Sequence, residues 1–151
     1  MCHLDLVRSF GGRVMRTWGQ LAFIASSAAI IAASPAGAQD QQQLVDRCVN
    51  SAGSYTPDGM IDACMWVVNS GKWSGKNMAW AYNNLGKAYY LKQDFKAALT
   101  KYNQAIELDP NDSYAYCGRG MTKTQLGDHA GGDADTAQAR KLDPHQCSSI
   151  Q

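Results

Sequence analysis

The sequence predicts an all-α fold of antiparallel helix-turn-helix repeats, an α-solenoid of about six helices. Two observations favour this fold. Residues 79–112 place large and small side chains at helical spacing on both sides of a tight turn, and the segment that follows, residues 113–146, repeats the same pattern at one fixed offset. The apolar share of 45% and the charged share of 18% are those of a globular domain.

Residues 79–112 read AWAYNNLGKAYYLKQDFKAALTKYNQAIELDPND. This segment predicts a helix from about Lys76 to Leu91 and a second helix from Asp94 to Leu108. Because only a tight turn separates the two helices, they must pack antiparallel. Pro110 follows the second helix and stops it, since proline cannot continue a helix.

The same pattern returns directly afterwards, which predicts a second repeat over residues 113–146 and a tail of residues 147–151. The identities at this fixed offset pair Tyr82 with Tyr116, Gly86 with Gly120, Asp94 with Asp128, Ala105 with Ala139, and Pro110 with Pro144. Several identities at one period are a strong signal of repeated architecture.

The second copy is more polar than the first. Arg119, Lys123 and Thr136 stand where the first copy has Leu85, Tyr89 and Tyr102. A terminal repeat has no further neighbour, so we expect these residues on a polar outer surface, with long side chains lying along apolar groups and their charges in water. Gly131 and Gly132 fall early in the last helix and weaken it by up to about 1 kcal/mol each relative to alanine.

Two helices are predicted before the repeats, over residues 41–50 and 57–70, with Thr56 as the N-cap of the second and Pro57 at its first position. A stack needs about three units to bury a continuous core. We therefore expect residues 39–78 to form an atypical N-terminal cap, with Trp66 sealing it against the first repeat.

The segment of residues 79–146 resembles the tetratricopeptide-repeat family. The resemblance implies that small residues sit where paired helices approach closely and that large residues fill the space around them. The residues matched to these packing roles are Tyr82, Leu85, Gly86, Tyr89, Ala98, Tyr102, Ala105 and Pro110 in the first repeat, and Gly120, Ala139 and Pro144 in the second.

The same resemblance implies a concave groove that binds extended or helical peptides. By this analogy the groove residues are Trp80, Asn83, Lys87 and Tyr90 in the first repeat, and Tyr114 and Met121 in the second. Chaperone-binding relatives clamp a terminal carboxylate with basic and asparagine residues. Here Asn83 and Lys87 are in swapped order and the second repeat offers Cys117 and Gly118, which argues against that particular recognition.

Residues 1–38 have the features of a secretory signal peptide. Arg8, Arg13 and Arg16 precede the apolar run of residues 21–33, which is followed by Ala36-Gly37-Ala38. We expect cleavage after Ala38 and a periplasmic or secreted protein without a membrane span. Met15 begins a segment that is a complete signal peptide by itself, so translation from either Met1 or Met15 is open.

Four cysteines follow the predicted cleavage site: Cys48, Cys64, Cys117 and Cys147. An even number in an exported chain favours two disulfides, and three pairings are possible. Spacing and compartment favour Cys48 with Cys64, which staples the cap, and Cys117 with Cys147, which ties the tail to the last repeat.

Charge and motifs exclude several functional classes. Three of the 14 basic and one of the 13 acidic side chains lie within residues 1–38, which leaves 11 basic and 12 acidic, without the basic stripe that nucleic-acid binding needs. No nucleophile elbow, phosphate-binding loop or zinc-protease motif occurs. His129, His145 and Cys147 match no common zinc spacing, so we expect neither metal nor cofactor.

We therefore expect a non-enzymatic protein that binds a protein or peptide partner. A structural or accessory subunit of an envelope complex, or a homo-oligomer, is the alternative. A thiol or metal enzyme is a third interpretation, which predicts free cysteines and bound metal. The mass in solution separates the first two, since an open groove suits a monomer and a subunit needs its partner.

Overall fold

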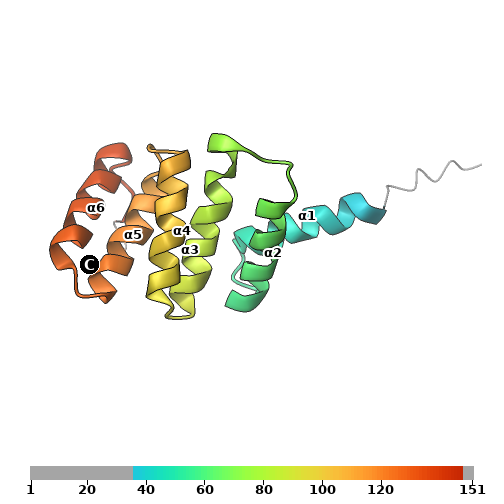
Figure 1. The fold of residues 1–151 in the computed structure, drawn as a ribbon, viewed down its shortest axis with the longest axis horizontal. Coiled ribbons are helices and arrows are strands. Elements are labelled where there is room, and N and C mark those ends of the chain that lie inside the picture. The colour runs from blue at the N-terminus through green and yellow to red at the C-terminus, as the bar shows by residue number, and fades with distance from the viewer. Residues whose placement is uncertain (1–35, 148–151) are drawn as a thin grey trace, which may run out of the picture. The chain divides into compact units, whose positions relative to one another are not determined.

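A computed structural model describes residues 36–147, and this part of the chain is all-helical. Its elements are α1 (Ala36–Val49), α2 (Pro57–Asn69), the short 3-10 helix η1 (Gly75–Met78), α3 (Ala79–Leu91), α4 (Phe95–Leu108), α5 (Ser113–Gln125) and α6 (His129–Leu142) (Figure 1). The predicted fold class of six helices in antiparallel pairs is confirmed. The predicted signal peptide lies outside the described residues except for its last three.

Each helix contacts the next one along the chain, from α1 through α6. In addition α3 contacts α5, so the first helices of the two repeats lie side by side on one face of the stack (Figure 1). This arrangement lets α3 and α5 share one surface. Within residues 36–147, no helix has the length and apolar character needed to cross a membrane.

Side-chain caps mark the starts of α2, α4, α5 and α6. Thr56 accepts a hydrogen bond from the backbone N–H of Gly59 and Pro57 opens α2, as predicted. Aspartates cap the next helices in the same way, by accepting from the N–H three residues on: Asp94 for α4, Asp112 for α5 and Asp128 for α6. The turns between paired helices contain Gln93 and Gly127, which both have positive φ at equivalent repeat positions.

Two predicted helix starts were wrong, and the predicted end of the second helix agrees to within one residue. The first helix begins at Ala36 rather than residue 41, because the glutamine-rich start is itself helical. The second ends at Asn69, with Ser70 as its C-cap. The predicted start of the third at Lys76 falls in a 3-10 turn, and α3 proper begins at Ala79.

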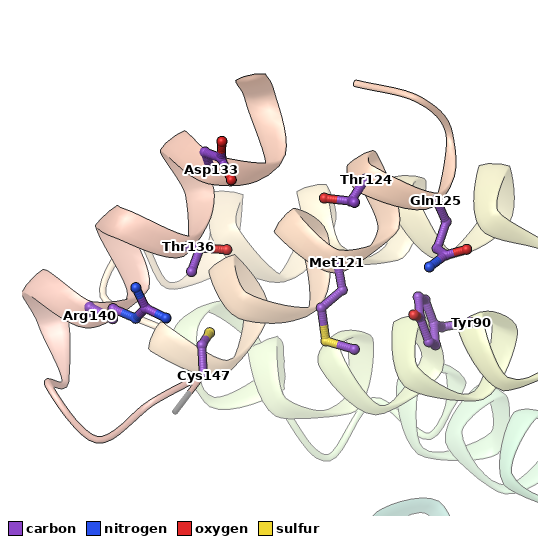
Figure 2. A pocket seen from close by; sticks show the side chains of 8 residues that line it. All are labelled: Tyr90, Met121, Thr124, Gln125, Asp133, Thr136, Arg140 and Cys147. Carbon is purple, nitrogen blue, oxygen red and sulfur yellow. The ribbon is translucent and has the colours of Figure 1, made fainter. Parts of the chain in front are cut away.

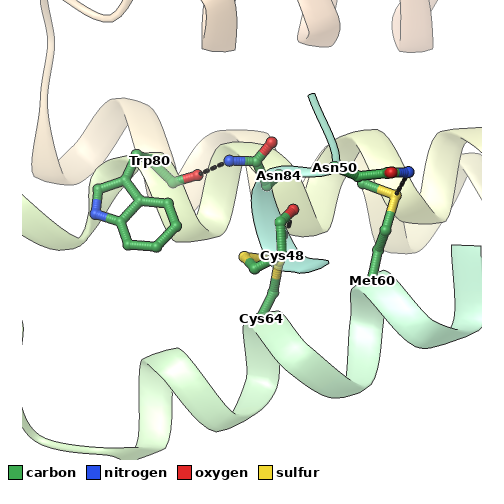
Figure 3. The surroundings of a disulfide bond; sticks show 6 residues. All are labelled: Cys48, Asn50, Met60, Cys64, Trp80 and Asn84. Atoms are coloured by element: carbon green, nitrogen blue, oxygen red, sulfur yellow. Dashed lines mark hydrogen bonds between the residues drawn. A yellow bond between two sulfur atoms is a disulfide. The ribbon is translucent and has the colours of Figure 1, made fainter. Parts of the chain in front are cut away.

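The N-terminal cap is joined to the first repeat by one apolar cluster. Buried side chains of α1 and α2 meet those of α3 there, and Trp66, Trp73 and Trp80 pack against the cluster while partly exposed. The Cys48–Cys64 disulfide lies within it (Figure 3). This is the place that the sequence predicted for Trp66.

The loop after α1 is closed by a buried asparagine. Asn50, 7% exposed, donates from its side-chain amide to the Tyr55 carbonyl at 3.0 Å and accepts from the Tyr55 N–H at 3.1 Å. Its amide nitrogen also lies 3.1 Å from the Met60 sulfur (Figure 3). Asn50 has a φ of 45°, a left-handed conformation that asparagine tolerates better than most residues.

The two repeats are joined through Tyr102, which is 4% exposed. Its ring lies against two glycines, since a Cβ at Gly86 would fall 2.7 Å from the ring and one at Gly118 would fall 2.3 Å from it. Gly86 was predicted as a small position facing the partner helix, and the structure shows that the group it admits is this aromatic ring. Glycine at 118 does the same in the next repeat.

The helices α5 and α6 cross closely at Gly120 and Gly132. A Cβ at Gly120 would lie 2.9 Å from the Gly132 carbonyl oxygen, and a Cβ at Gly132 would lie 2.4 Å from the Thr124 hydroxyl oxygen. Gly132 is buried there. The prediction counted Gly132 only as a weak helix former, whereas the crossing requires it.

Arg119 and Lys123 hold their charges against a carboxylate rather than in water, which corrects their predicted roles. Arg119 donates to both carboxylate oxygens of Asp135 at 2.7 and 2.8 Å, and the Lys123 ammonium lies 2.9 Å from the same carboxylate. The side chain of Asp135 is 7% exposed, that of Arg119 19% and that of Lys123 24%. This ion network therefore joins α5 to α6, in addition to the apolar cluster of Cys117, Ala139 and Cys147.

This network also reaches the first repeat. The Arg119 Nη1 donates to the Asn103 side-chain oxygen on α4 at 2.9 Å, and its guanidinium lies 5.2 Å from the centre of the Tyr116 ring. Burial alone raises the pKa of Asp135, but hydrogen bonds from Arg119 and Lys123 outweigh it, so the pKa is lowered overall. The hydrogen bond to Asp135 likewise raises the pKa of Arg119.

Candidate peptide-binding groove

A groove of about 420 Å³ opens between α3 and α5. It is lined by Asn83, Asn84, Lys87, Tyr90, Leu91, Tyr102, Tyr114, Cys117, Gly118, Met121 and Gln146. Five of the six residues expected from the family resemblance are among them: Asn83, Lys87, Tyr90, Tyr114 and Met121. The contact between α3 and α5 brings these residues together from both repeats.

Trp80, the sixth expected residue, is placed differently. It lines a separate cavity of about 490 Å³ together with Trp73, Lys76, Asn77, Ala79, Asp109 and Asp112. The Trp80 ring meets Trp73 edge-on, with ring centres 5.8 Å apart at 87°, and packs on the cap cluster. Trp80 therefore packs against the N-terminal cap and does not line the groove. The repeat pattern alone could not show this contact.

The groove surface is largely apolar and aromatic. Tyr114 is 62% exposed and Leu91 52% exposed, so both present bare surface to a ligand. Asn84 donates its amide to the Trp80 carbonyl at 2.9 Å, which fixes that side chain at the groove wall (Figure 3). Lys87 is exposed and is the charged residue among those that line the groove.

A smaller pocket of about 320 Å³ adjoins the groove and shares Tyr90 and Met121 with it. Figure 2 shows Met121 on α5, with Thr136, Asp133 and Arg140 on the neighbouring α6. Cys147 closes this pocket from the segment after α6 (Figure 2). The shared residues make the two hollows one continuous surface.

The second disulfide places the end of the described chain at the groove. Cys147 is joined to Cys117 in the middle of α5, and both are buried. The preceding residue, Gln146, lines the groove. The segment after α6 thus forms part of the groove wall, and the two disulfides in the structure have the pairing that the sequence favoured.

Six lining residues were not among the predicted groove residues, although Cys117 and Gly118 had been named as what the second repeat offers there. Asn84 and Leu91 lie one helical turn before and after Lys87, so helical spacing could have found them. Gly118 occupies in the second repeat the position that Asn84 has in the first, so the repeat offset could have found it. Cys117 likewise occupies the position that Asn83 has in the first repeat. Gln146 and Tyr102 could not be found this way, because Gln146 is held at the groove by the neighbouring disulfide and Tyr102 reaches it through the gap over Gly118.

His129 and His145 lie at the two ends of α6 and form no metal site in the described chain. His129 begins α6 and His145 follows its end. Among residues 36–147, no three His, Cys, Asp or Glu side chains come close enough together to hold a metal ion.

Comparison with known proteins bears on the fold and the groove. Residues 86–127 match a family model described as TPR repeat. Among solved structures, the second TPR of Spaghetti (RPAP3), bound to the HSP90 peptide SRMEEVD, superposes with a TM-score of 0.55 and 26% sequence identity, over 70% of this chain and 91% of that one. The described helices form a tetratricopeptide-repeat (TPR) fold.

Two curated relatives are similar to part of this chain. The small glutamine-rich tetratricopeptide repeat-containing protein 2 of Mycosarcoma maydis is 38% identical over 52 residues, which are 34% of this chain and 15% of that protein. The mouse (Mus musculus) DnaJ homolog subfamily C member 7 is 34% identical over 68 residues, or 45% of this chain and 14% of that protein. The match thus spans about a seventh of the length of either relative.

Proposed function

We propose that this TPR protein binds a peptide segment of a partner protein, non-covalently, in the groove between α3 and α5. The observation that carries the proposal is the groove itself, about 420 Å³ in volume, which combines the exposed Tyr114 and Leu91 with the cation Lys87. Aromatic side chains of this kind anchor partners because they offer a large contact area at low conformational cost.

The structural neighbour supports the same use of the fold, since it is a TPR bound to a peptide. The groove here differs from a site for a particular terminal carboxylate. Its second repeat contributes Cys117 and Gly118 where further polar side chains would be needed, and Cys117 is used in a disulfide. We infer an apolar peptide with few charges as the ligand class.

The groove is tested by selecting peptides from a displayed library of short random sequences on the oxidised protein and measuring their affinities by calorimetry. We expect Tyr114→Ala to weaken the selected peptides by about tenfold or more, because an exposed aromatic anchor is lost. Lys87→Ala is expected to weaken them less.

Lys96→Ala is the matched control, because Lys96 is an exposed lysine on α4 outside the groove. The affinity of this variant should equal that of the wild type. Selected peptides that bind Tyr114→Ala and Lys87→Ala with unchanged affinity would show that the partner binds elsewhere.

We also propose that the chain is exported and that residues 1–38 are removed. Two disulfides in residues 36–147 support this proposal, because an oxidising compartment favours them. For protein recovered from the envelope of a bacterial host we expect an N-terminus at Gln39 and no free thiol in the denatured chain, by mass spectrometry with thiol alkylation. A retained Met1 or Met15, or four alkylated cysteines, would contradict export.

A further inference from the structure

Tyr102 is a tyrosine where the fold needs only an aromatic ring. The ring is 4% exposed and spans the space from Gly86 to Gly118. Its Cγ side lies against Gly86, and its Cζ and hydroxyl oxygen lie at Gly118, where a Cβ would fall 2.3 and 2.6 Å from them. Tyr102 and Gly118 both line the groove. The hydroxyl therefore lies at the groove floor, beneath a residue without a side chain.

No hydrogen bond joins the Tyr102 hydroxyl to another residue of the described chain. The hydroxyl oxygen is open to the groove rather than sealed in the core, because the fully buried side-chain atom without a partner in residues 36–147 is the Nε of Arg47. Phenylalanine would fill the same space between the helices, so the hydroxyl is not needed for packing. A phenolic hydroxyl that faces a groove and has no protein partner can donate to a ligand.

The hydroxyl is suited to donate. Burial is the main cause that raises the pKa of Tyr102 well above its ordinary value, and the neighbouring Tyr90 adds to the effect. The phenol thus keeps its proton throughout the physiological range. It can offer that proton to an oxygen acceptor.

We propose that Tyr102 is a ligand-binding residue, whose hydroxyl donates through the gap at Gly118 to an acceptor oxygen of the bound peptide. The inference rests on the proposed peptide binding and names the ligand chemistry of that groove. Gly118 has two roles here, because it admits the Tyr102 ring and leaves the hydroxyl uncovered.

The charge of the groove favours a side-chain carboxylate of the peptide, rather than one of its main-chain carbonyls, as the acceptor for the Tyr102 hydroxyl. Lys87 lines the groove together with the amides of Asn83 and Asn84, and none of the lining residues within 36–147 carries a carboxylate. A cation, two amides and a phenolic donor beside apolar side chains suit an acidic side chain flanked by apolar residues.

The test compares two neutral-ended peptides, acetyl-Ala-Leu-Glu-Leu-Ala-amide and its Gln counterpart, in NMR titrations of the full mature protein. We expect the Glu peptide to bind wild type more tightly than the Gln peptide, and Tyr102→Phe to weaken the Glu peptide by about tenfold. Tyr82→Phe is the matched control, since Tyr82 packs in the same cluster but lines a different pocket.

Stability separates a ligand role from a structural one. An unpaired hydroxyl predicts that Tyr102→Phe unfolds at the same urea concentration as wild type or at a higher one, whereas a structural hydrogen bond predicts a lower midpoint. Equal weakening of both peptides by Tyr102→Phe would support the hydroxyl contact and assign the acceptor to a main-chain carbonyl.

Two results overturn the inference. One is Tyr102→Phe binding the Glu peptide as tightly as wild type. The other is that neither pentapeptide binds while library peptides still depend on Tyr114, which would leave the groove function standing without the Tyr102 contact. If no peptide of either kind binds, the inference and the proposed function both fail.

Discussion

Replacing Arg119 by leucine is expected to lower the free energy of unfolding by about 3 kcal/mol, although leucine is the residue at the equivalent position of the first repeat. In the second repeat Arg119 supplies two hydrogen bonds to Asp135, whose side chain is 7% exposed. Leucine would leave that carboxylate with Lys123 as its remaining partner. Urea denaturation followed by circular dichroism measures the loss.

The double variant Arg119→Leu with Asp135→Ala tests the cause. Removing both charges leaves no buried carboxylate unpaired, so we expect the double variant to be more stable than Arg119→Leu alone. Arg140→Leu, at an exposed arginine of α6, serves as the control and should change stability by less than about 0.5 kcal/mol. If the double variant lost as much stability as Arg119→Leu and Asp135→Ala together, the ion network could not be the reason why Arg119→Leu is destabilising.

The ion pair of Arg119 and Asp135 also predicts how the stability of the protein depends on pH. The pKa of Asp135 is lower in the folded protein than in the unfolded chain, where it is about 4. The ionised carboxylate therefore adds fully to the free energy of unfolding above the unfolded-state pKa, and this stabilisation is lost as the pH falls through the folded-state pKa. The stability difference between wild type and Arg119→Leu should therefore be constant from pH 7 to about pH 4 and shrink below it. Burial raises the pKa of Asp112, but this acts in both proteins and cancels in the comparison.

Gly118→Ala is expected to lower the free energy of unfolding by about 2–3 kcal/mol. This is the second of the two large effects that we predict. The added methyl group would lie 2.3 Å from the Tyr102 ring, which is held on its other side at Gly86. A rigid ring between two helices can make room only by moving a helix. The thermal midpoint should fall by several degrees, measured by calorimetry.

Gly59→Ala is the control for this effect. Its methyl group would meet the Thr56 hydroxyl oxygen at 3.3 Å and the Arg47 side chain at 3.8 Å, so little has to move. We expect a change of less than about 1 kcal/mol, because alanine also favours the helix. A Gly118→Ala variant as stable as Gly59→Ala would contradict the close contact between Tyr102 and Gly118.

The fixed repeat period was enough to predict the fold. Helical spacing and the capping residues Thr56 and Asp94 are local signals, so the pairs of helices could be predicted from the sequence, apart from the first-turn boundaries of α1 and α3. Five groove residues followed from the resemblance because one constant offset between the repeats puts α3 and α5 in register on one face.

What the sequence could not show depends on contacts between helices and between repeats. Arg119 and Asp135 are far apart in the chain and polar, so each by itself suggests an exposed surface. Asp135 was overlooked because its partners lie on another helix. Trp80 fits the groove by position, yet its contact with Trp73 in the cap decides where it lies. Tyr102 resembles any other core residue until Gly118 is seen to uncover its hydroxyl.

The proposal that a peptide binds between α3 and α5 is tested most directly by mapping where a selected peptide contacts the protein. Backbone NMR signals of the labelled mature chain, recorded with and without the tightest library peptide, report those contacts residue by residue. We predict that the largest shifts fall on α3 and α5, at Lys87, Leu91, Tyr114 and Met121. Shifts confined to the cap helices α1 and α2, or to the outward sides of α4 and α6, would contradict peptide binding in this groove.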